Sequence, residues 1–190
     1  LTRSEKEYIL NNFFNAKYET MIYKYPTYRK LFKKRFASNS ITIDDFSEQE
    51  FSDLMALFNI IWIDATHYYN YPELNRLAKK GHNYSLKDRI RIINLQKQII
   101  KEIIPTYKKY IQQGRIELTT SPYYHPIMPI LCDYETATKN LPNRENLPVN
   151  FNLKKDAHNQ IKSALNKIEE IFGKRPKGMW PSEFCLTNKT

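Results

Sequence analysis

Apolar side chains recur at helical spacing along most of the first 114 residues, and polar residues occupy the positions between them. This pattern predicts amphipathic helices. Ser4 is placed to cap the first, and Ser47 with Glu50 has the spacing of a capping box for the third. Ser85 can cap the last helix, which Pro105 should kink. The predicted ranges are 4–24, 28–36, 47–64, 72–80 and 85–114.

The period changes after Gly114. Residues 115–120 alternate between polar and apolar and predict a strand, residues 156–173 return to helical spacing, and residues 178–180 predict a second strand. Between the first strand and this helix, several prolines indicate a loop with a few helical turns. A strand–helix–strand order predicts two parallel strands joined by a right-handed crossover. In parallel α/β sheets and barrels, active sites lie at the carboxyl ends of the strands.

Two chemically interesting segments follow the predicted strands, residues 121–126 and residues 181–183. Glu183, close to Trp180, fits the nucleophile of a retaining glycosidase, although it could equally be an ordinary surface glutamate. His125 could hydrogen-bond to a sugar hydroxyl, or be satisfied by backbone groups of its own loop. Tyr124 could stack on a sugar ring or serve only in packing.

The composition narrows the class of protein. With 190 residues and 41% apolar content, the chain is expected to fold as a single domain over 1–190. It has only four glycines and no glycine-rich phosphate-binding motif. Cys132 and Cys185 lack the spacing of zinc ligands and are expected to be free thiols in a reducing compartment. No signal-peptide pattern or apolar run of ~20 residues occurs, which predicts a cytoplasmic protein without a membrane span.

The net charge of +10 arises from 30 basic and 20 acidic residues. A basic chain can bind nucleic acid, and salt-sensitive retention on DNA or RNA would support that alternative. The lysines are spread along the whole chain, however, and their distribution favours a solvated surface. A dedicated nucleic-acid interface is therefore the least favoured of the functions considered.

Two sequence runs are long and specific: TTSPYYHPIMPILCD at 119–133 and GMWPSE at 178–183. Together with FSEQE at 46–50 and LFNIIWID at 57–64, they make the chain resemble glycoside hydrolase family 57, in its amylopullulanase-like branch. The resemblance implies an α/β fold that is part of a (β/α)7-type barrel, helix-rich with few parallel strands. It further implies retaining cleavage or transfer at α-glucosidic bonds, with starch, glycogen or maltooligosaccharides as substrates and no metal or organic cofactor.

The resemblance also assigns roles to single residues. Glu183 matches the catalytic nucleophile that closes the Trp-x-x-Glu motif of the family. His125 matches a histidine that lines the donor-sugar site, and Trp180 is expected to shape that site. Tyr124 is a further candidate for sugar binding.

Other features of the family are not found in the sequence. Its first strand, with a His-Gln-Pro motif, is expected before Leu1, and its acid/base aspartate after Thr190; the residues that follow Glu183 also differ from the family pattern. The chain is therefore interpreted as a fragment or truncated form of the barrel. The alternative is a catalytically inactive, glucan-binding remnant. The sequence leaves open the linkage, the choice between hydrolase and transferase, and the oligomeric state.

Overall fold

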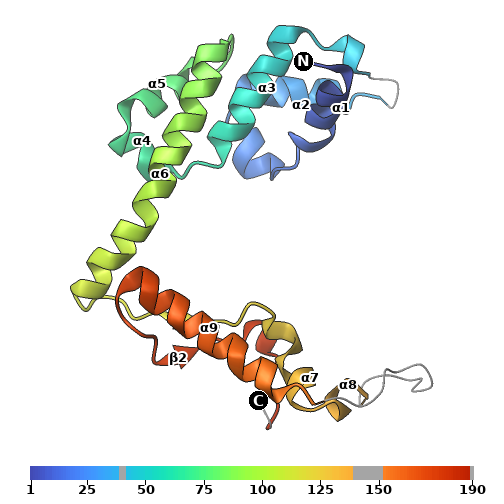
Figure 1. Cartoon of the computed structure of the whole chain (residues 1–190). Helices are drawn as coiled ribbons and strands as arrows, with labels where there is room; N and C mark the ends of the chain where they lie inside the picture. The colour runs from blue at the N-terminus through green and yellow to red at the C-terminus, as the bar shows by residue number, and fades with distance from the viewer. Residues whose placement is uncertain (39–41, 139–151, 189–190) are drawn as a thin grey trace. The chain divides into compact units, whose positions relative to one another are not determined.

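The computed structural model describes residues 1–38, 42–138 and 152–188, and these form two compact units, Leu1–Glu102 and Ile103–Thr190 (Figure 1). The longest helix, α6 (Leu86–Gln112), begins in the first unit and ends in the second, with Pro105 inside it. The predicted single domain over 1–190 stays a prediction.

The first unit is built from helices, as the apolar spacing predicts. Helix α3 (Glu48–Ile61) supplies the largest part of its core, because Phe51, Leu54, Leu57 and Ile60 are fully buried. The other elements are α1 (Arg3–Asn12), the π-helical turn η1 (Tyr18–Ile22), α2 (Pro26–Arg35), the 3-10 turn η2 (Ile43–Asp45), α4 (Ala65–Asn70), α5 (Pro72–Lys80) and the start of α6. Their buried side chains join one cluster around α3.

The prediction of one helix over 4–24 is wrong. Helix α1 ends at Asn12, whose side-chain amide donates to the carbonyl of Tyr8 at 2.8 Å. Asparagine competes in this way with the helical backbone, and Phe14 then turns into the core. The cap also lies two residues earlier than predicted, because Thr2 and not Ser4 forms the capping box with Glu5.

The predicted helix start at Ser47 is confirmed. Its hydroxyl accepts from the Glu50 amide at 3.2 Å, and the Glu50 carboxylate accepts from the Ser47 amide at 2.9 Å. The helix ends at Ile61 rather than near Asp64, because Asp64 caps the additional short helix α4. Gly81, with φ +71°, ends α5 in the left-handed conformation that glycine adopts without strain.

Asp88 forms the predicted cap of α6 together with Ser85. Its carboxylate accepts from the Ser85 amide at 2.9 Å and from Lys80 at 2.6 Å. The hydrogen bond from Lys80, and then those from Ser85, hold the pKa of Asp88 well below its usual value. The ionised carboxylate therefore stabilises the folded unit above the unfolded pKa of about 3.9, and this contribution is lost as the pH falls toward the lower folded pKa.

We expect Asp88→Asn to lower the free energy of unfolding of the first unit by about 1 kcal/mol at pH 7. The difference from the parent protein should shrink as the pH falls from about 5 to 2, because the unfolded parent then binds a proton at Asp88 that the folded parent binds only at lower pH. Trp62 fluorescence during urea unfolding, in a Trp180→Phe background, reports on this unit alone. A difference that stays constant over this pH range would show that the charge of Asp88 has no part in the effect.

The second unit contains the predicted pair of parallel strands. Strand β1 (Thr119–Thr120) pairs with β2 (Gly178–Met179), with Thr119 opposite Gly178 and Thr120 opposite Met179. The remaining described elements are η3 (His125–Ile127), α7 (Met128–Cys132), α8 (Glu135–Thr138), α9 (Lys154–Phe172) and η4 (Ser182–Phe184). The strands are shorter than the predicted ranges 115–120 and 178–180.

A small core holds the second unit together. Met128 and Leu131 of α7 pack against Ala157 of α9, and Ile161 joins them partly buried. Helices with two parallel strands are compatible with part of an α/β barrel, while the seven-stranded type stays a prediction. Part of the loop predicted after β1 lies outside the described residues, since it includes 139–151.

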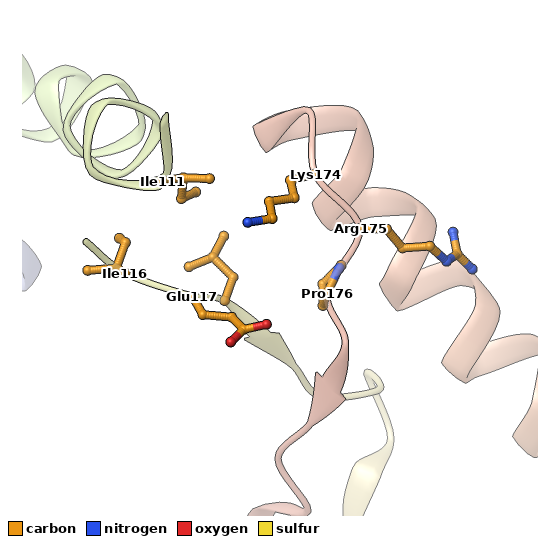
Figure 2. A pocket seen from close by; sticks show the side chains of 7 residues that line it. Ile111, Ile116, Glu117, Lys174, Arg175 and Pro176 are labelled. Carbon is orange, nitrogen blue, oxygen red and sulfur yellow. The ribbon is translucent and has the colours of Figure 1, made fainter. Parts of the chain in front are cut away.

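The amino ends of the two strands surround only a small space. Figure 2 shows Lys174 pointing between Ile111, Ile116 and Glu117, whereas Arg175 points away from them. Arg175 pairs with Glu169 of α9 at 2.7 Å, which fixes the turn between α9 and β2. The space measures about 10 Å³, enough for about one water molecule. This space is too small to hold a sugar ring.

Candidate active site

The carboxyl ends of β1 and β2 hold the two candidate segments side by side. The Trp180 amide donates to the carbonyl of Thr120 at 2.8 Å. One residue further on, the Ser121 hydroxyl donates to the carbonyl of Trp180 at 2.6 Å. A side-chain hydrogen bond thus continues the pairing after the strands have ended, and the segments leading to His125 and Glu183 leave the sheet together, as the sequence predicts.

Glu183 lies in a strained turn. Its backbone is left-handed, with φ +57° and ψ +14°, and Phe184 follows with φ +52°. Residues other than glycine adopt this conformation at a cost of about 1–3 kcal/mol each, and such residues are frequent at functional sites. The Phe184 ring stands edge-on to the Trp180 indole, with centroids 5.4 Å apart. This contact connects the turn to the end of β2, and both Glu183 and Trp180 are exposed.

His125 lies in the turn η3, which packs against η4, the turn that contains Glu183. Its Nδ1 is 3.2 Å from the Pro122 carbonyl. When Nδ1 donates to that carbonyl, Nε2 of the neutral ring is a hydrogen-bond acceptor. The loop backbone thus satisfies one ring nitrogen, as the structural alternative for His125 predicts, and the other nitrogen keeps its capacity to accept from a hydroxyl.

Tyr124 directly precedes His125 and lines a groove between the segment that follows β1 and helix α9. Its amide donates to Oε1 of Gln160 at 3.2 Å. The groove has a volume of about 800 Å³, and neither Glu183, His125 nor Trp180 lines it. The structure therefore brings three of the four predicted site residues to the carboxyl end of the strand pair. The fourth, Tyr124, lines a groove that the other three do not line.

The apolar spacing of residues 156–173 does not predict the residues of α9 that line this groove. They form a second row at helical spacing, on the polar face of the helix. This row could have been found by the same count of periodic positions. It consists of Asp156, Asn159, Gln160, Ser163 and Lys167.

The described part of the chain contains no group of three or more His, Cys, Asp or Glu side chains arranged to hold a metal ion. Cys132 and Cys185 are free thiols. Within the same residues, no helix has the length and apolar character needed to cross a membrane.

The sequence matches the model of glycosyl hydrolase family 57 over residues 2–190. The chain belongs to this family. The match covers both units, which confirms the predicted family, while the amylopullulanase-like branch stays a prediction. Searches of curated proteins and of solved structures gave no significant match. Membership of family 57 indicates a glycosidase domain and makes a carbohydrate the expected class of substrate.

Proposed function

We propose that the chain carries the nucleophile of a retaining glycosidase that acts on α-glucans, and that Glu183 is this nucleophile. The proposal rests on where Glu183 lies in this member of a glycosidase family. The residue is in a strained, exposed turn at the carboxyl end of a parallel strand. Catalytic groups of parallel α/β proteins occupy this end of the strands.

The surroundings of Glu183 support this role. The turn starts from a paired strand and packs against η3, so the carboxylate is held by rigid elements. Trp180 is 53% exposed and offers an indole face to a pyranose ring. His125 lies in η3, which packs against the turn that contains Glu183, and its Nε2 can accept a hydrogen bond from a hydroxyl of the bound sugar. Tyr124 is proposed as a sugar contact further along the substrate.

The proposed reaction has two steps. A carboxylate oxygen of Glu183 attacks the anomeric carbon and forms an ester, while the bond to the leaving oxygen breaks and that oxygen takes a proton from a general acid. Water, or the hydroxyl of a second sugar, then attacks the same carbon, releases Glu183 and gives its proton to the conjugate base. Two inversions retain the α-configuration. The general acid is the aspartate that the family resemblance implies.

Covalent trapping tests the nucleophile without needing this acid. A glucosyl fluoride of α-configuration, with a second fluorine on the sugar ring, loses fluoride without protonation, and the ring fluorine slows release of the sugar. We expect intact mass spectrometry to show one added fluoroglucosyl group, and peptide mapping to place it on Glu183. Glu183→Gln should remain unlabelled and Glu19→Gln, at an exposed position in the first unit, should be labelled. A folded chain that stays unlabelled, or carries the sugar on another carboxylate, would contradict the proposal.

A further inference from the structure

The groove beside Tyr124 has features of a binding site that the proposed reaction does not use. Its volume of about 800 Å³ lies within the range of small-molecule sites. One wall runs from Thr120, the last residue of β1, to Tyr124, and the other is the polar face of α9. Both walls belong to the second unit, so its shape is set within one compact body.

The wall formed by α9 is a row of hydrogen-bonding side chains. Asn159 and Ser163 are one turn apart, and Lys167 follows one turn later. All three are exposed. Half-buried Ala164 and Ile168 line the groove next to these polar groups. The amide and hydroxyl groups can both donate to and accept from sugar hydroxyls, the ammonium group can donate to them, and the apolar positions can contact C–H groups.

The opposite wall is aromatic. Tyr123 and Tyr124 are 83% and 57% exposed, and their rings stand nearly perpendicular, with centroids 4.7 Å apart. A pyranose ring presents C–H groups on its faces and hydroxyls around its edge. It can therefore rest a face on a tyrosine while its hydroxyls reach the polar row of α9.

The two walls are held in place before any ligand binds. The Tyr124 amide donates to Gln160, which fixes the tyrosine loop on α9, and the Ser121 hydroxyl anchors the start of the same loop to the Trp180 carbonyl. Pro122, between these anchors, is buried. Preorganisation of this kind reduces the entropy lost on binding.

We propose that this groove is an accessory glucan-binding site, which holds a stretch of the α-glucan chain outside the reacting bond. None of Glu183, His125 and Trp180 lines it, so its ligand does not touch the proposed nucleophile. A carbohydrate ligand is consistent with the family, and the choice of an α-glucan rests on the proposed function. Tyr123, Asn159 and Lys167 are the residues expected to determine its affinity.

Calorimetric titration of the 190-residue chain with maltoheptaose tests the site. Glu183→Gln serves as the background, because it prevents turnover during the titration. We expect Tyr123→Ala and Asn159→Ala each to raise the Kd about fivefold to tenfold. Tyr69→Ala removes a tyrosine that is 91% exposed in the first unit, and Lys162→Ala removes an exposed lysine of α9 outside the groove; both should leave the Kd unchanged.

The outcomes separate this inference from the proposed function. An unchanged Kd in both Tyr123→Ala and Asn159→Ala, with circular dichroism showing folded chains, would overturn the accessory site. If maltoheptaose does not bind, or if a β-linked cello-oligosaccharide binds equally well, the proposal of an α-glucan ligand is overturned. Binding that depends on Tyr123, in a chain whose Glu183 is never labelled by the fluoride reagent, would support the groove and overturn the nucleophile.

Discussion

Replacement of Glu183 by alanine is expected to slow the release of fluoride from α-glucosyl fluoride by about 10³-fold or more. Fluoride leaves without a proton, so the measured rate depends on the nucleophile and not on the general acid. The substitution removes the only group that the proposal assigns to attack on the anomeric carbon. A fluoride-selective electrode records the rate, including any first-turnover burst.

Azide should restore the reaction of Glu183→Ala. This small anion can enter the space that the carboxylate leaves and attack the anomeric carbon from the same side, displacing fluoride in a single inversion. The expected product is therefore β-glucosyl azide, which proton NMR distinguishes from the α-anomer. Glu19→Ala, which removes an exposed carboxylate of the first unit, should keep the parent rate and yield no azide product. An undiminished rate in Glu183→Ala, or an α-azide, would exclude the proposed role.

The fold was predictable where local chemistry decides it. The serine–glutamate pair at Ser47 and the serine–aspartate pair at Ser85 begin helices as predicted, because each satisfies backbone amides that only a few residues on either side can reach. Helix ends were less predictable. Asn12 and Asp64 are residue types that occur both inside helices and at their ends. Burial of Phe14 determines that α1 ends at Asn12, and the start of α4, which Asp64 caps, determines where α3 ends.

The position of the candidate site was predictable and its details were not. A strand–helix–strand order places both loop segments at one end of the strands, and the pairing of Thr120 with Met179 confirms this arrangement. The left-handed backbone at Glu183 had no signal, because neither Glu nor Phe favours it. The position of Tyr124 beside α9 also depends on a tertiary hydrogen bond from its amide to Gln160, a partner 36 residues away.

Asp53, in the first unit, is another residue whose role in the fold could not be predicted from the sequence. In the sequence it is one polar position within an apolar helix, yet only 5% of it is exposed. Its carboxylate accepts from the amides of Asn83 at 3.0 Å and Tyr84 at 2.7 Å, and from the Gln49 side chain at 2.9 Å. These bonds fasten the turn before α6 to α3, where Asn83 adopts a left-handed φ of +55°.

We expect Asp53→Ala to lower the free energy of unfolding of the first unit by about 2–5 kcal/mol. The substitution leaves two backbone amides without their acceptor, one of them in the buried Tyr84, and each orphaned group costs about 1–3 kcal/mol. Asp53→Asn retains one side-chain oxygen as an acceptor and should lose about half as much. Urea unfolding followed by Trp62 fluorescence, in the Trp180→Phe background, gives the values.

Asp44→Ala is the matched control for Asp53→Ala, because the Asp44 side chain is 75% exposed and its only ion pair, among the residues described, is with Arg3 at 3.7 Å. Its loss should cost less than about 0.5 kcal/mol. Equal effects at the two aspartates would mean that water replaces the Asp53 carboxylate at the turn. A large effect confined to Asp53 would instead identify this buried anion as the connection between α3 and the start of α6.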